Sequence, residues 1–70
     1  GWELTDRFRF AVVRRVTLGE NLKIEIKQRK DRYFEVWLCS ETGNVLVDSF
    51  PVRAQADQLA VYLKKGIEVQ

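Results

Sequence analysis

The stretch LKIEIKQRKDRYFEVWL, residues 22–38, decides the fold. Its apolar residues come at every second position, in two series: Leu22, Ile24 and Ile26, then Phe34, Val36 and Leu38. In a strand, successive side chains point to opposite faces, so each series predicts one buried face. The charged segment 28–32 between them is typical of a hairpin tip. The stretch therefore predicts two antiparallel strands joined by a tight turn.

Charge decides between two registers for this hairpin. With residues 30–32 as the tip, Lys27 lies opposite Glu35, and the pair has opposite charges. A five-residue tip would instead set Glu25 opposite Glu35, and like charges directly across a strand pair destabilise it. We therefore expect the three-residue tip.

A further strand is predicted before this hairpin. Its expected inward residues are Phe8, Phe10 and Val12, which alternate with Arg7, Arg9 and Ala11. The alternation loses phase at Val12 and Val13, where a β-bulge is expected. The segment 18–21 supplies the turn into the next strand.

A fourth strand is predicted after the hairpin, following a turn over residues 41–44. With Ser40 opposite Val45, the residues Val45 and Val47 point inward. The same register directs three residues outward: Leu46, Asp48 and Phe50.

The period changes to that of a helix after Phe50. Apolar residues recur at helical spacing at Val52, Ala56, Leu59, Ala60 and Leu63. Pro51 suits the first turn of a helix, because its missing N–H costs nothing there. Gly66 after two lysines is typical of a helix exit. The predicted helix spans about Val52 to Lys65.

These elements predict an α+β fold, with a four-stranded antiparallel meander sheet and one C-terminal helix packed on one face. They form a single small β-β-β-β-α domain over residues 1–70, alone or within a longer protein. The predicted core is Phe8, Phe10, Val12, Leu22, Ile24, Ile26, Phe34, Val36, Leu38, Val45 and Val47 against Ala56, Leu59, Ala60 and Leu63. So small a core yields little net stability, and edge pairing or dimerisation would add to it.

The residue inventory argues against several functions. The chain has no His and one Cys, Cys39, so a zinc site, a disulfide framework and a His-activated nucleophile are not expected. Glu25 and Glu35 are expected near each other, but the lysines around them do not suit acid–base catalysis. We therefore expect no enzyme activity, no cofactor and no metal. A lone thiol favours a reducing compartment, the cytoplasm or nucleus, and no apolar run approaches the length of a membrane span.

The positive charge belongs to the first half of the chain. Residues 7–32 hold nine basic and three acidic side chains, although the whole chain has a net charge of only +2. On the predicted outer face these cations lie beside Tyr33 and Trp37, and nucleic-acid binding uses cations for phosphates and flat rings for bases. The predicted nucleic-acid-binding residues are Arg7, Arg9, Lys23, Lys27, Arg29, Lys30, Arg32, Tyr33 and Trp37. Either DNA or RNA would fit.

Two other interpretations of the same residues stay open. Charged side chains are ordinary on the solvent face of an antiparallel sheet, and cations on edge strands prevent unwanted pairing. In the first interpretation these side chains are an ordinary solvated face. In the second, the domain binds a protein partner or forms a homodimer, through the same face or through an edge strand.

The segment Tyr33-Phe34-Glu35-Val36-Trp37-Leu38, followed by Gly43, Phe50, Ala54 and Ala56, resembles small DNA-binding domains in outline. These are the plant ethylene-response domains and the arm-binding domains of phage integrases, which have three strands and a helix. Four strands followed by a helix are also similar to half of the Whirly-type single-strand binders. The chain departs from the three-stranded families in its additional first strand, and it lacks the diagnostic motifs of all three. The resemblance implies nucleic-acid contact, and such an analogy rests on fold alone.

Overall fold

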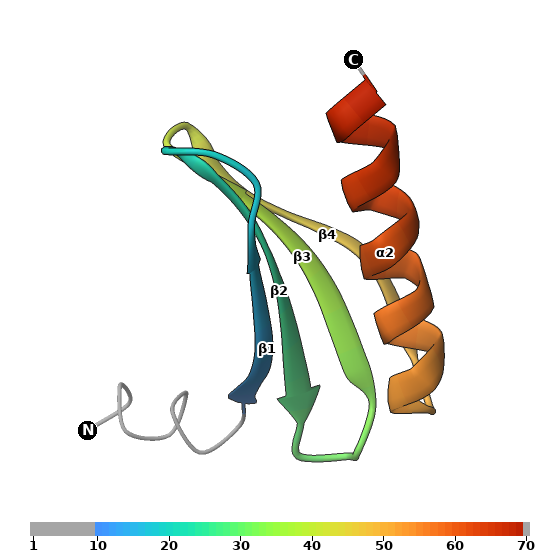
Figure 1. Ribbon diagram of the computed structural model, residues 1–70. Helices are drawn as coiled ribbons and strands as arrows, with labels where there is room; N and C mark the ends of the chain where they lie inside the picture. The colour runs from blue at the N-terminus through green and yellow to red at the C-terminus, as the bar shows by residue number, and fades with distance from the viewer. Residues whose placement is uncertain (1–9, 70) are drawn as a thin grey trace, which may run out of the picture.

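The computed structural model describes residues 10–69 of the chain (Figure 1). Its elements are β1 (Phe10–Thr17), β2 (Leu22–Arg29), β3 (Phe34–Ser40), β4 (Gly43–Phe50) and the helix α2 (Arg53–Val69). The strands form one antiparallel sheet in the order β1-β2-β3-β4, and α2 packs on one face of it. The predicted α+β meander with a C-terminal helix is therefore confirmed.

The central hairpin has the predicted register. Lys27 lies opposite Glu35 and Ile26 opposite Val36, with residues 30–32 as the tip. Asp31 accepts a hydrogen bond from the backbone N–H of Tyr33 at 3.2 Å, which closes the turn. Lys27 and Glu35 thus place opposite charges across from each other outside the core, and Ile26 and Val36 form an apolar pair within it. This is the register that the charges predicted.

The bulge predicted in the first strand is present, between Val12 and Arg14. The strand before the bulge has the opposite phase to the one predicted, because Val12 lies opposite Lys27 and is 46% exposed. The prediction of Val12 as a core residue is wrong, and Val13 and Val16 pack against the core in its place. The predicted core residue Phe8 and the side chain of Phe10 lie outside the part of the chain that the structure describes.

The register predicted for the last hairpin is wrong. Ser40 pairs with Gly43, not with Val45, so the turn is the two residues Glu41 and Thr42. Gly43 has a φ of 149°, a conformation that favours glycine over any residue with a side chain. The tight turn is possible because glycine stands at this position.

A bulge also interrupts β4, and the sequence analysis did not predict it. Leu46 lies opposite Trp37 and Asp48 opposite Val36, which leaves Val47 as the extra residue. The phase of β4 therefore reverses after Val47. Leu46 lies on the outer face as predicted, but the outward placement of Asp48 and Phe50 is wrong. Phe50 pairs with Phe34 and packs against the core.

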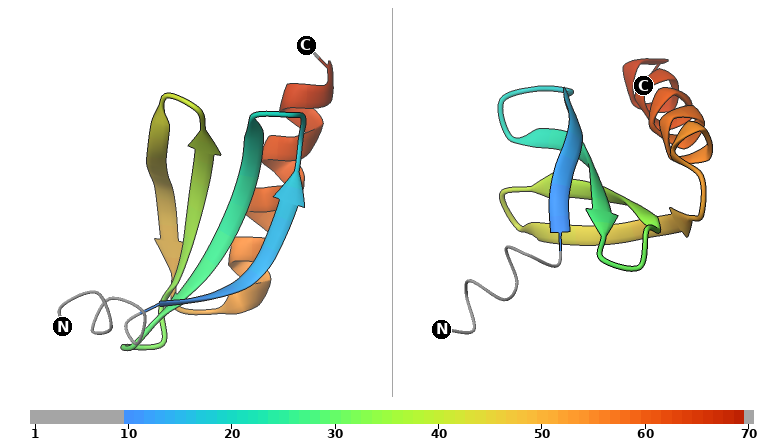
Figure 2. Two further views of the ribbon diagram at one scale, coloured as in Figure 1. Left: turned by 90° about the vertical axis from the view of Figure 1, so that its left-hand side faces the viewer. Right: turned by 90° about the horizontal axis from the view of Figure 1, so that it is seen from below.

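The core is smaller than the sequence pattern predicted. Its fully buried members are Ile24, Ile26, Val36, Ala56 and Ala60. Val45 and Val47 are 61% and 39% exposed, so their assignment to the core is wrong. The helix runs away from the turn end of the β3–β4 hairpin and leaves it uncovered (Figures 1 and 2). Leu22 is partly buried but lies outside the main cluster.

The helix begins at Arg53, close to the prediction, but it continues past Gly66 to Val69. Gly66 as a helix exit is therefore wrong. Ile67, which follows it, is partly buried and gives the last turn an apolar contact surface. Two polar contacts tie the start of α2 to β1: Arg14 to Asp57 at 3.1 Å, and Arg53 to the carbonyl of Val13 at 3.2 Å. Within residues 10–69, no helix is long and apolar enough to cross a membrane.

Candidate nucleic-acid interface

No helix or strand of residues 10–69 covers the face of the sheet opposite the helix, hereafter the outer face (Figure 2, left). The strand alternation and the β1 bulge direct seven interacting side chains to it: Arg15, Lys23, Glu25, Lys27, Glu35, Trp37 and Cys39. Arg29 and Tyr33 continue the same face toward the β2–β3 turn. Cations, carboxylates and an indole ring therefore share one surface.

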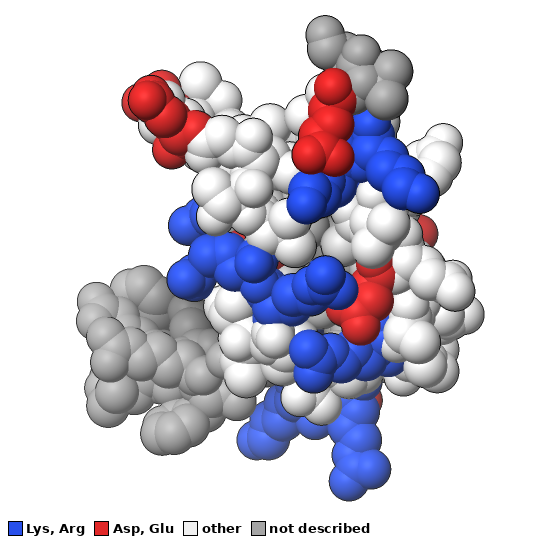
Figure 3. Space-filling view, viewed as in Figure 1, with Lys and Arg blue, Asp and Glu red and all other residues white. Residues whose placement is uncertain are grey.

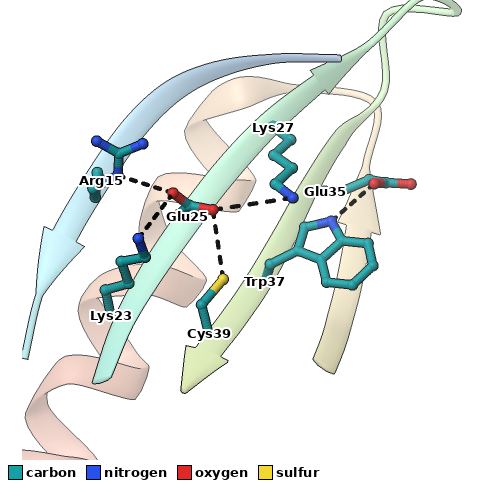
Figure 4. A network of polar contacts seen from close by, with 7 residues as sticks. All are labelled: Arg15, Lys23, Glu25, Lys27, Glu35, Trp37 and Cys39. Carbon is teal, nitrogen blue, oxygen red and sulfur yellow. Dashed lines mark hydrogen bonds and ion pairs between the residues drawn. The ribbon is translucent and has the colours of Figure 1, made fainter. Parts of the chain in front are cut away.

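A buried carboxylate stands at the centre of this face (Figure 4). Glu25 is only 7% exposed, and three cations converge on it. The Nε atom of Arg15 lies 2.9 Å from Oε2 of Glu25, the Nζ of Lys23 lies 3.8 Å from the same oxygen, and the Nζ of Lys27 lies 4.0 Å from Oε1. The cluster carries three positive charges and one negative charge, so it is cationic overall.

The cations keep Glu25 ionised. Burial alone would raise its pKa, because a low dielectric disfavours the charged form. Hydrogen bonds from Arg15 and Cys39, together with the charges of Lys23 and Arg15, outweigh burial and hold the pKa of Glu25 below its ordinary value. At neutral pH the carboxylate is therefore a fixed anchor for the three cations.

Cys39 lies beneath this cluster and is buried. Its Sγ donates a hydrogen bond to Oε1 of Glu25 at 3.5 Å. Burial raises the pKa of Cys39, and the hydrogen bond and negative charge of Glu25 raise it further. The side chain is therefore held as a neutral thiol, which is the less reactive form.

A second carboxylate organises the aromatic part of the face. Glu35 accepts a hydrogen bond from Nε1 of Trp37 at 2.9 Å, and an Arg29 nitrogen lies 3.6 Å from its other oxygen. The Nζ of Lys27 lies 4.8 Å from the centre of the Trp37 ring, within the range of a cation–π contact. The guanidinium of Arg29 is similarly 6.0 Å from the Tyr33 ring. Each ring thus already holds a cation over it.

The β2–β3 turn extends the positive surface beyond the sheet. Arg29 pairs with Asp31 at 2.9 Å, while Lys30 and Arg32 are exposed and make no ion pair with any residue between 10 and 69. In Figure 3 basic side chains cover the middle and the lower end of the molecule, where Figure 1 places β1 and this turn. Acidic side chains mark the upper left, at the opposite end of the strands.

The opposite end of the outer face holds an open hollow of about 480 Å³. Arg15, Lys23 and Glu25 line it from the sheet, and Glu20 and Glu41 line it from the two turns. The two turn carboxylates offset the two cations, so this end of the face is not cationic. An anionic ligand is therefore favoured at the β2–β3 end.

The structure brings together most of the predicted binding residues. Lys23, Lys27 and Trp37 meet around the two carboxylates, while Arg29, Lys30, Arg32 and Tyr33 stand at the β2–β3 end. The predicted residues Arg7 and Arg9 lie outside residues 10–69.

Sequence reasoning missed Arg15 and the burial of the two glutamates. In the structure Val12 faces outward, and the bulge after it turns Arg15 to the outer face. The expected phase, with Val12 inward and a bulge after it, would have directed Arg15 inward. Nothing in a single sequence shows that cations will close over Glu25 and Glu35, because that depends on which strands are neighbours.

Comparison with protein-family models, with curated proteins and with solved structures finds no match to this chain. Between residues 10 and 69, no group of three or more His, Cys, Asp and Glu side chains is placed to hold a metal ion.

Proposed function

We propose that the protein is a non-enzymatic nucleic-acid-binding module that uses the outer face and the β2–β3 turn. The observation that carries the proposal is the convergence of Arg15, Lys23 and Lys27 on the single buried carboxylate of Glu25. The carboxylate holds the three cations in place. Glu20 and Glu41 offset the charges of Arg15 and Lys23 at the far end of the face, so Lys27 and the cations of the β2–β3 turn supply the positive surface for phosphates. Cations held in advance lose less side-chain entropy when they meet phosphates.

The cation–π contacts favour phosphate contacts over base stacking. Lys27 lies over the Trp37 ring, and Trp37 is itself held by Glu35. A base that stacked on that face of the ring would have to displace Lys27. We therefore infer that the ring positions the cation, and that the ligand is a duplex contacted through its backbone. Such binding falls steeply as salt is raised, because each phosphate contact releases counterions.

The test compares two double variants that remove equal charge. Lys30→Ala/Arg32→Ala removes two cations from the turn, and Lys64→Ala/Lys65→Ala removes two exposed cations from the helix on the other side of the sheet. Binding to a fluorescent duplex is measured by anisotropy across a salt series. We expect only the turn variant to flatten the plot of log affinity against log salt, by about 0.9 per lost contact on a DNA duplex.

Two results would overturn the proposal. One is a dissociation constant no tighter than about 10⁻⁴ M at physiological salt, the weak limit of non-specific binding. The other is an equal loss of affinity in both double variants, because net charge alone would then explain binding. A single-stranded oligonucleotide of the same length is titrated in parallel. If it binds more tightly than the duplex and Trp37→Ala abolishes the difference, the ring stacks on bases and the inferred backbone mode is wrong.

A further inference from the structure

The edge strand β4 exposes apolar side chains that the sequence pattern assigns to a core. Three consecutive residues, Val45, Leu46 and Val47, are 61%, 46% and 39% exposed. Among residues 10–69, β4 pairs only with β3, so one side of its backbone has no strand partner within this part of the chain. An edge strand of this composition is a template for pairing with another chain.

The charged residues of the two edge strands indicate which chain pairs with β4. No charged residue occurs from Gly43 to Val47, and Asp48 is the only one in β4. A two-fold axis that sets this stretch against itself therefore brings no like charges together. The other edge strand, β1, carries Arg14 and Arg15, and pairing it with itself would oppose cations. A contact between β4 and β1 would not close and would grow an open chain of molecules. The surface of β4 thus fits a second copy of β4.

The bulge in β4 and the tight turn also fix a register. The bulge at Val47 limits the regular part of β4 to residues 43–46. In a two-residue hairpin the closing pair, Ser40 and Gly43, direct their backbone groups at each other. Alternate residues then direct theirs outward, so Asn44 and Leu46 offer backbone groups at the free edge.

We propose that two copies of the chain pair antiparallel through β4, with the two-fold axis at Val45. Asn44 then lies opposite Leu46 of the second copy, so that both outward-directed residues find backbone partners. Val45 lies opposite Val45 of the second copy, and the bulged Val47 lies opposite a glycine, Gly43. An added Cβ at Gly43 would meet nothing within 4 Å inside its own chain, so no side chain of that chain crowds the face of the sheet at this position.

The resulting assembly is one eight-stranded sheet. Because the axis is perpendicular to the sheet, both helices lie on one side and both Glu25 clusters on the other. The dimer would bury the valines that the small core leaves exposed and would remove the free β4 edge. It does not depend on the proposed nucleic-acid function, and its tests use no nucleic acid.

The first test measures the oligomeric state by sedimentation equilibrium. We expect a dimer that dissociates on dilution, and a dimer dissociation constant at least about tenfold weaker for Val45→Lys, because it sets two like charges directly across the axis. Val61→Lys is the control, because Val61 is also apolar and 44% exposed but belongs to α2. Circular dichroism checks that each variant keeps its fold. A monomer at every concentration up to about 1 mM, the weak end of measurable affinity, overturns the proposal. An equal weakening by both lysine variants also overturns it.

The second test examines the register with one cysteine introduced in addition to the buried Cys39 of the chain. Directly opposite residues in a non-hydrogen-bonded antiparallel pair have Cα atoms about 4.5 Å apart, which a disulfide can span. Val45→Cys should therefore form a covalent dimer under mild oxidation, seen on a non-reducing gel. Leu46→Cys should not, because each Leu46 lies opposite Asn44 and not opposite itself. If Leu46→Cys crosslinks as fast as Val45→Cys, the axis is not at Val45.

Discussion

The two edge strands, β1 and β4, both contain a β-bulge, but they differ in the charged side chains they carry. Both β1 and β4 contain a bulge, and bulges at sheet edges discourage pairing with other chains. β1 also carries two cations, and each is tied to a neighbour: Arg15 to Glu25 on the outer face, and Arg14 to Asp57 of the helix. β4 carries no cation and is exposed over Val45, Leu46 and Val47. A bulge alone therefore does not close an edge, and in this domain the charges distinguish the closed edge from the open one.

The largest expected effect tests whether the stability of both edge strands depends on the same buried core. Ile24 is fully buried in β2 and lies between Val16 of β1 and Leu38 of β3. Ile24→Ala should lower the free energy of unfolding by about 2–5 kcal/mol, because it leaves a cavity where the sheet meets the helix. Urea unfolding measures the change, and hydrogen exchange should show β1 and β4 losing protection together. A loss of protection confined to β1 would mean that the β3–β4 hairpin is stable without that core.

The next largest effect is a dependence of stability on pH, which should differ between the two edge strands. The pKa of Glu25 lies below its ordinary value of 4.5, so its ion pairs contribute stability above that value. The contribution is lost as the pH falls below 4.5 and through the lowered pKa of the folded state. Glu25→Gln should cost about 1.5–3 kcal/mol at neutral pH, the range for hydrogen bonds to a charged group. It should also flatten the dependence of stability on pH below 4.5.

Hydrogen exchange on the same samples shows which edge responds. Because Arg15 of β1 bonds to Glu25, acid or Glu25→Gln should speed exchange in β1 more than in β4. Equal changes at both edges would contradict the assignment of Glu25 as the anchor of β1.

The same comparison shows how much of the fold the sequence could predict. Alternation at residues 22–38 and opposite charges at Lys27 and Glu35 were enough for the central hairpin, because its two strands follow each other directly. The β1 bulge left a visible loss of phase at Val12 and Val13. The β4 bulge left none, because Val45, Leu46 and Val47 are all apolar and any phase fits them. A run of consecutive apolar residues gives no alternation from which a register can be inferred.

The candidate site likewise has a part that the sequence could predict and a part that it could not. The placement of Lys23, Lys27 and Trp37 on one face followed from alternation, as did the basic turn. The burial of Glu25 did not, because it requires Arg15 from β1 and Lys23 and Lys27 from β2 to close over one carboxylate. Such convergence depends on side-chain directions across neighbouring strands, which the pattern of one strand does not contain.

A smaller effect, in the stabilising direction, concerns the C-terminal end of α2. Gly66 lies within α2, and a Cβ added there meets nothing within 4 Å. Gly66→Ala should raise the free energy of unfolding by about 0.5–1 kcal/mol, because alanine loses less conformational freedom in a helix. Thermal unfolding of the variant measures it. Destabilisation would show that the helix ends before residue 66 in solution, as the sequence alone predicted.

The smallest expected effect tests whether the charge of Arg14 on β1 stabilises the fold. Arg14 pairs with Asp57, and the two side chains are 42% and 33% exposed, so solvent partly screens the pair. Arg14→Ala should cost about 0.2–0.5 kcal/mol, close to the change of about 0.5 kcal/mol or less expected for the exposed reference variant Lys30→Ala. Raised salt should reduce the cost further, since it screens exposed charges. Urea unfolding at low and high salt measures both variants. A cost well above 1 kcal/mol, or one that salt does not change, would show that Arg14 holds β1 on the helix. The expected small cost would instead mean that Arg14 closes the β1 edge by repelling other strands, which is the property that β4 lacks.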